Sequence, residues 1–194
     1  MTDSEQMWTL VALGIAAIVI AIAAFVLTRR GTKARRAELQ RHFGPEYERA
    51  VDEFGSPERA ERELERRKRR VEHFHFKPLT PADQARFSES WTRIQAEFVD
   101  NPVAAVTRAN ALITEVMRAR GYPVERFEQR VQDLSVAHPG VVQHYRAAHE
   151  LSLSVNNEAT ATENLRQAVV HYRALFAELL QGAPDTVEWE RAHA

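Results

Sequence analysis

The sequence predicts an all-α protein with an N-terminal single transmembrane helix, a charged helical stalk and a C-terminal bundle of about five short helices. Two observations predict this class. An uncharged apolar run lies near the N-terminus of the 194-residue chain, and from Thr80 onward apolar residues recur with a helical period between Pro- and Gly-bearing turns. No segment shows the sustained alternation of a half-buried strand.

The apolar run predicts a transmembrane helix over residues 8–28. From Trp8 to Leu27, 18 of 20 residues are apolar and none is charged. As a helix this run is about 30 Å long, the thickness of a bilayer core. The alternative is a cleaved signal peptide, because Ala21-Ile22-Ala23 resembles a small-x-small cleavage site. The first seven residues carry two acids and no Lys or Arg, which favours the uncleaved anchor.

Basic residues follow the span and none precedes it, which predicts the orientation. By the positive-inside rule, residues 1–7 lie outside and the C-terminal domain lies in the cytoplasm, so the chain is a single-pass protein of the inner membrane. The same cations are expected to contact anionic lipid headgroups: Arg29, Arg30, Lys33, Arg35 and Arg36. Small residues at 17, 21 and 24 share one helix face, which leaves a homodimer through the membrane helix as an alternative.

Residues 29–77 form the expected stalk and connector. The helix after the membrane continues to Gly44-Pro45, a second runs from Pro45 to Gly55, and a third begins at Pro57 behind the N-cap Ser56 and reaches about residue 72. The third helix is almost entirely charged and is interpreted as a solvated spacer. The alternative is a weak helix contact through the sparse seam of Ala60, Leu64 and Val71. Interleaved glutamates weaken the basic run 66–70, so no nucleic-acid partner is expected.

Residues 78–181 are expected to form the helical bundle, followed by a polar tail over 182–194. Five helices are predicted from their start signals and apolar stripes. They span 81–99 and 102–120, then begin at Pro123, Pro139 and the Thr160–Glu163 capping box. About 100 residues are enough to bury one core.

Composition and motifs argue against an enzyme. The chain has no cysteine, which excludes disulfides, thiolate metal sites and catalytic thiols. Isolated glycines form neither a dinucleotide-binding fingerprint nor a phosphate-binding loop, and no nucleophile motif is present. The eight histidines lack the spacing of helical metal ligands. We therefore expect no catalytic residue, no metal and no cofactor.

The last two predicted helices carry a candidate surface for a ligand or partner. Its residues are cationic or titratable: Arg146, His149, Arg166, His171 and Arg173. Their convergence would make a pocket for an anion or a peptide. The alternative is a structural network in which these groups pair with the acids Glu128, Asp133 and Glu150.

Several stretches of the cytoplasmic part resemble a known family. They are KPLTP (77–81), WTRIQAEFVDNPVAAV (91–106), residues 117–150 around Gly121-Tyr122-Pro123, and NLRQAVVHYRALFAELL (164–180). They are similar to a family of small single-pass bacterial membrane proteins, mainly actinobacterial, with a C-terminal helical domain. The resemblance covers roughly residues 44–181. It implies a shared architecture and carries no activity, cofactor or catalytic residue.

Two functions follow as expectations. The first is a membrane-anchored, non-enzymatic module at the inner membrane, either an interaction module or a scaffold, which binds a protein partner through the exposed surface of its bundle. The second is a membrane-tethered sensor that binds an anion or small molecule in an Arg/His pocket of the bundle.

Overall fold

The computed structural model describes residues 33–153 and 158–181, which form helices and short connections without a strand in these ranges. The expected membrane helix, Arg29, Arg30 and the polar tail lie outside the described residues. Within those ranges, no helix is both long enough and apolar enough to cross a membrane. Residues up to Arg41 form one compact unit and those from His42 form another. In the first unit, Lys33 and Arg35 are exposed on a helix.

Helices α2 (Pro45–Phe54) and α3 (Pro57–Val71) begin and end where the sequence predicts. Gly55 ends α2 in the left-handed region, at φ 73°, and its N–H donates to the Val51 carbonyl oxygen. This region favours glycine because a Cβ would be strained there. The Ser56 side chain accepts a hydrogen bond from the Arg59 N–H and caps α3. The predicted caps of both helices are therefore confirmed.

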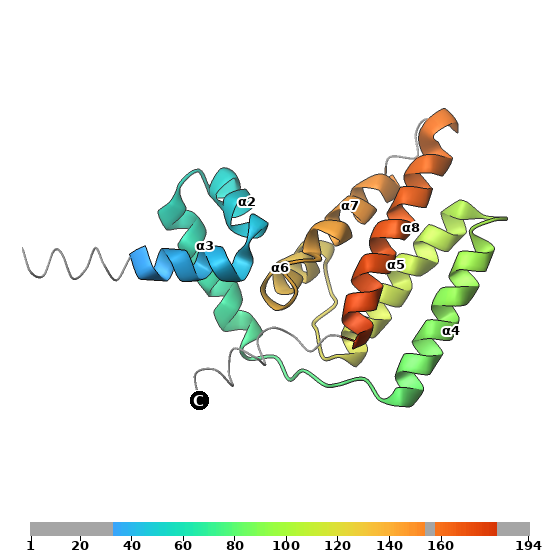
Figure 1. Cartoon of the computed structure of the whole chain (residues 1–194), viewed down its shortest axis with the longest axis horizontal. Helices are drawn as coiled ribbons and strands as arrows, with labels where there is room; N and C mark the ends of the chain where they lie inside the picture. Colours follow the sequence, from blue (N-terminus) through green and yellow to red (C-terminus); the bar gives the residue numbers. More distant parts are fainter. Residues whose placement is uncertain (1–32, 154–157, 182–194) are drawn as a thin grey trace, which may run out of the picture. The chain divides into compact units, whose positions relative to one another are not determined.

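The interpretation of α3 as a solvated spacer is wrong. Ala60 and Leu64 have no exposed surface and Val71 is 1% exposed. The seam packs within the unit, and α3 contacts both α2 and α6 (Figure 1). The surrounding charges do not prevent this burial, because long Arg and Lys side chains keep their charged ends in water while their stems cover apolar surface.

Five further helices surround a single core, as expected from the sequence. They are α4 (Pro81–Glu97), α5 (Pro102–Ala119), α6 (Phe127–Ala137), α7 (Val142–Leu153) and α8 (Glu158–Gln181). Helix α8 packs against α5 and α7, and α4 covers the other side of α5 (Figure 1). The Trp91 and Phe176 rings stack with centroids 4.9 Å apart, which joins α4 to α8. Tyr145 and Tyr172 are fully buried between α7 and α8.

Three predicted helix starts are wrong. Pro123 lies in an extended connection because α5 ends at Ala119, Gly121 follows with a φ of +90°, and the Tyr122 N–H donates to the Met117 carbonyl oxygen. This closing pattern directs the chain away from the helix axis, and α6 begins only at Phe127. Pro139 lies in a turn followed at once by Gly140, so α7 begins at Val142. Helix α8 begins at Glu158, ahead of the predicted capping box.

Candidate functional site

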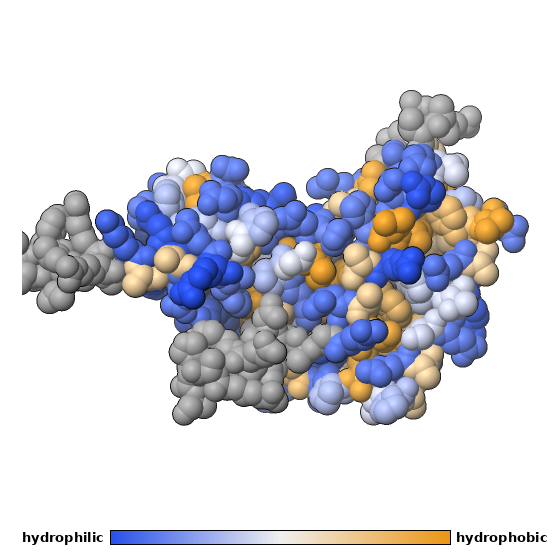
Figure 2. Space-filling model, in the orientation of Figure 1, coloured by the Kyte–Doolittle hydropathy of each residue, from blue (hydrophilic) through white to orange (hydrophobic). Residues whose placement is uncertain are grey.

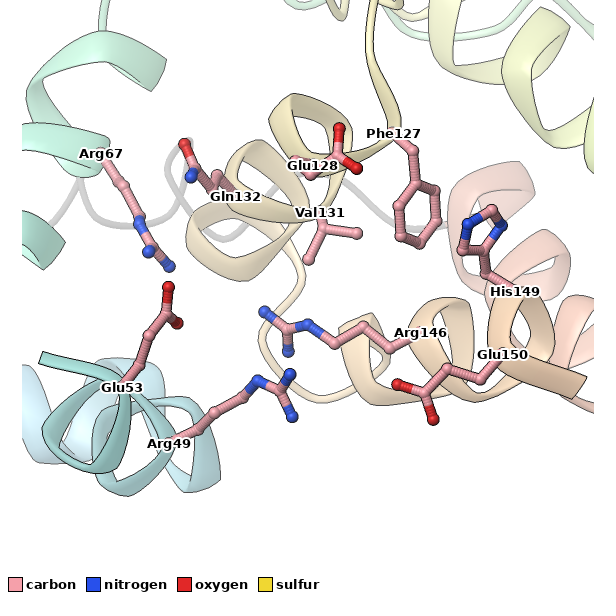
Figure 3. A pocket seen from close by; sticks show the side chains of 10 residues that line it. All are labelled: Arg49, Glu53, Arg67, Phe127, Glu128, Val131, Gln132, Arg146, His149 and Glu150. Carbon is pink, nitrogen blue, oxygen red and sulfur yellow. The ribbon is translucent and has the colours of Figure 1, made fainter. Parts of the chain in front are cut away.

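A charged cleft opens where α2, α3, α6 and α7 meet. Its volume is about 280 Å³. The residues that line it come from all four helices (Figure 3): Arg49, Glu53, Arg67, Phe127, Glu128, Val131, Gln132, Arg146, His149 and Glu150. Polar and charged side chains dominate this lining, so the cleft suits a charged ligand.

Two of the three guanidinium groups in the cleft are already paired. Arg146 of α7 donates to the carboxylate of Glu46, which is 1% exposed at the start of α2. Arg67 of α3 is 3% exposed, and its Nε donates to Glu63 over 2.9 Å. Burying a charge without a partner is costly, so these carboxylates hold the two arginines in place. The Arg146–Glu46 contact also joins α7 to α2.

Arg49 is the third guanidinium, and it differs from the other two. It is exposed, and among the described residues it has neither a hydrogen bond nor an ion pair. Figure 3 shows the guanidinium groups of Arg49 and Arg146 both pointing into the cleft. An anionic group of a ligand would therefore find donors from two helices.

An aromatic pair forms another wall of the cleft. The His149 ring stacks on Phe127, with the centroids 3.7 Å apart and the planes inclined by 23°. Burial lowers the pKa of His149, and the nearby Glu128 and Glu150 partly oppose this shift. The imidazole is therefore neutral at pH 7, and the pair presents a flat, uncharged surface to the cleft.

Three carboxylates complete the lining: Glu53, Glu128 and Glu150. All three are exposed, and within the described part of the chain none of them forms an ion pair or hydrogen bond. In Figure 3, the Glu128 carboxylate lies beside Phe127, whereas the Glu150 carboxylate lies across Arg146 from the Phe127 and His149 rings. Counted with their partners Arg66, Glu46 and Glu63, the charged side chains at the cleft comprise four guanidinium groups and five carboxylates.

The structure brings together only two of the five residues predicted as a candidate surface. Arg146 and His149 line the cleft, one turn apart on α7. The other three lie on α8 and do not line it. Arg166 is exposed and pairs with Glu163 over 2.7 Å, His171 shares a 2.8 Å hydrogen bond with His144 through their Nδ1 atoms, and Arg173 is exposed.

The alternative of a carboxylate network takes a different form from the one expected. Asp133 is fully buried and accepts two hydrogen bonds from Arg70 of α3, at 2.7 and 3.0 Å. Arg146 uses Glu46 rather than an acid of the bundle. These two interhelical pairs therefore join the bundle to α2 and α3.

A second depression, of about 430 Å³, lies between α4 and α5. Arg108 and Glu97 pair across it over 2.9 Å. Because it lies between only two helices and Arg108 is paired across it, this depression makes a weaker candidate than the four-helix cleft. Among the described residues, no group of three or more His, Asp or Glu side chains could hold a metal ion.

Comparison with known proteins assigns no family. The chain matches no protein-family model, no curated protein and no solved structure. The resemblance to single-pass bacterial membrane proteins therefore stays a prediction.

The sequence does not place Arg49, Glu53 and Arg67 at the cleft, because the dense charge of α3 is typical of a solvated spacer. A signal was present: Ala60, Leu64 and Val71 share a helix face with Arg67, which is buried with them. A buried arginine among apolar residues indicates a packed, paired position.

Proposed function

We propose that this chain is a membrane-anchored, non-enzymatic recognition module at the cytoplasmic face of the inner membrane. Its binding site is the four-helix cleft. The observation that supports this proposal is the set of uncommitted charges around one concave surface: Arg49, Glu53, Glu128 and Glu150. Charged groups that lack a partner within the fold are available to a ligand at no cost to internal contacts.

The anchor and the absence of catalysis rest on the sequence. The apolar run at Trp8–Leu27 and the basic residues after it support an inner-membrane protein with its C-terminal domain in the cytoplasm. A reporter enzyme fused after Ala194 is expected to be active only in the cytoplasm. Activity confined to the outside would overturn this topology.

Site-specific photocrosslinking tests the cleft. Benzoylphenylalanine replaces Glu53, an exposed residue of the cleft, in the full chain within cells; the matched control replaces Glu89, which is exposed on α4. After irradiation, mass spectrometry of the purified chain is expected to find adducts at position 53 and few at position 89. Equal yields at the two positions, or none at either, would contradict the proposal.

A second candidate function is binding of a protein partner at the turn between α4 and α5. Val99 is 83% exposed and Val103 is 53% exposed. Figure 2 shows hydrophobic side chains over this end of α4 and α5, and over α8, on a mostly hydrophilic face. Crosslinking in membranes through position 99 is expected to give a discrete protein adduct, and loss of that adduct in Val103→Ser would place the contact there. The absence of an adduct at position 99 would count against this candidate.

A further inference from the structure

We propose that the cleft binds a zwitterion with a net positive charge: a small molecule with one carboxylate and one or more ammonium or guanidinium groups, the chemistry of a basic amino acid. This inference rests on the proposed function, because it names the ligand class of the same cleft. It differs from the expected anion site, since it assigns the opposite charges of one ligand to different residues of the lining.

The carboxylate of the ligand is assigned to Arg49 and Arg146. Arg49 has no carboxylate partner in the described chain, and Arg146 uses Glu46 for only part of its donor set. A guanidinium has five N–H donors in a planar fork, so both arginines retain donors that point into the cleft. Glu46 balances the charge of Arg146 alone, so a carboxylate of the ligand between the two guanidinium groups would supply the partner that Arg49 lacks.

The cationic group of the ligand is assigned to the aromatic pair and its neighbouring carboxylates. In Figure 3, Glu128 lies beside the stacked rings of Phe127 and His149, and Glu150 follows His149 directly on α7. A guanidinium or ammonium is attracted to the face of an aromatic ring and gains further from carboxylates at its edge. The neutral state of His149 matters here, because an imidazolium would repel the same cation.

The charge balance excludes a simple anion as the favoured ligand. Glu46 pairs with Arg146, and Glu63 is shared by Arg66 and Arg67, so the carboxylates at the cleft exceed the guanidinium groups by one. A phosphate or sulfate would be repelled by this excess, whereas a zwitterion with two cationic groups is matched to it. The volume of about 280 Å³ suits a ligand of amino-acid size.

Three probes separate the two ends of the ligand. L-Arginine carries the carboxylate and the guanidinium, agmatine lacks the carboxylate, and L-norvaline lacks the guanidinium. Binding of each to the full chain, purified in detergent, is measured by isothermal titration calorimetry. L-Arginine is expected to bind about tenfold or more tightly than either analogue, because each analogue leaves one wall without its partner.

Two variants test which residues bind the carboxylate and which bind the cationic group of the ligand. Arg49→Gln is expected to weaken L-arginine about tenfold and to leave agmatine within about twofold. Glu150→Gln is expected to weaken L-arginine and agmatine but not L-norvaline. Arg173→Gln and Glu89→Gln are the matched controls, since both residues are exposed and lie on α8 and α4, outside the cleft. Both should leave all three affinities unchanged.

The outcomes distinguish the ligand from the site. Agmatine that binds as tightly as L-arginine would overturn the assignment of a carboxylate to Arg49 and Arg146. Preference for inorganic phosphate over L-arginine would overturn the zwitterion altogether. Failure of all three probes, with adducts still formed at position 53, would overturn this ligand class and leave the cleft as the recognition site. Failure of both the probes and the crosslink would overturn the two proposals together.

Discussion

Gly121 is the residue whose replacement the fold tolerates least among the described glycines. Its φ is +90°, and a Cβ there would lie 2.4 Å from the carbonyl oxygen of His75, a backbone atom. Gly121→Ala is expected to lower the free energy of unfolding by about 2–4 kcal/mol, because an alanine is strained at this positive φ and its Cβ would displace the backbone at His75.

Gly55→Ala is the matched control for this substitution. Gly55 also has a positive φ, of 73°, but a Cβ at this position would have no atom of a non-adjacent residue within 4 Å. The substitution is expected to cost only about 1 kcal/mol, from the left-handed conformation alone. Urea unfolding of the two variants measures the difference, and equal losses would show that the contact with His75 contributes nothing.

The His144–His171 contact predicts acid sensitivity. The two Nδ1 atoms lie 2.8 Å apart, so one must donate and the other accept. Burial, and then the neighbouring His144, lower the pKa of His171. Below about pH 6.5 the unfolded chain therefore binds more protons than the folded one, and stability is lost as pH falls from 6.5 toward the folded pKa.

Replacement of His171 tests this sensitivity. His171→Gln is expected to reduce the slope of unfolding free energy against pH between about pH 6.5 and 5, whereas His73→Gln, at an exposed position, should not. Thermal unfolding at several pH values supplies the measurement. An unchanged slope in His171→Gln would show that the pair does not control acid stability. Some slope should remain in either variant, since burial also lowers the pKa of His149.

At the scale of the helices, residue type predicts a helix end where the end depends on the local backbone. Gly55 ends α2 and Ser56 caps the start of α3 as expected, because a left-handed conformation and a capping hydrogen bond depend on the residue itself. The start of α6 could not be predicted in the same way. Pro123 is compatible with both a helix start and an extended chain. Contacts between the end of α5 and residues distant in the sequence decide between the two. One such contact is the hydrogen bond from the Lys77 N–H to the Arg120 carbonyl oxygen.

The contact between α3 and α6 depends on Arg70 and Asp133. Burial raises the pKa of Asp133, and Arg70 partly offsets that shift through its hydrogen bonds and charge. Arg70→Met is expected to destabilise the fold by about 3–5 kcal/mol, because it leaves a fully buried carboxylate without its cation. The stability of this variant should also fall further as pH rises, since the unfolded carboxylate ionises more readily than the buried one.

Arg69→Met is the matched control on the same helix. The Arg69 side chain is 65% exposed and lies 3.9 Å from Glu65, so the loss should be below about 1 kcal/mol. Chemical denaturation of both variants at pH 7 gives the comparison. If Arg70→Met is no more harmful than Arg69→Met, the buried pair does not hold α3 on α6.

For the whole molecule, the difference between the expected and observed site follows from sequence distance. Arg146 and His149 are three residues apart on one helix, and their shared face is evident from the sequence. Arg49 and Arg67 reach the same cleft only because α2 and α3 fold back onto α6 and α7. That return depends on a sparse apolar seam and on two ion pairs spanning 63 and 100 residues. No local pattern in the chain specifies such pairs.

The packing of α2 and α3 against α6 and α7 predicts how stable the chain is when it is divided at residue 78. From His42 onward the chain forms one compact unit, so a fragment 42–194 is expected to unfold in a single cooperative transition. A fragment 78–194 lacks α2 and α3, which exposes the α3-facing side of α6 and leaves Asp133 and Arg146 without Arg70 and Glu46. It is expected to be less stable by about 3 kcal/mol or more.

A substitution within the shorter fragment identifies the cause of that loss. Asp133→Asn removes the unpaired charge but not the exposed surface, so it should restore part of the stability of 78–194 while destabilising 42–194, where the ion pair with Arg70 is intact. Calorimetry of the four proteins measures these opposite effects. Equal stability of the two unsubstituted fragments would instead make residues 78–194 an independent domain, and α2 and α3 would then be an attached arm that contributes ligand contacts without supporting the fold.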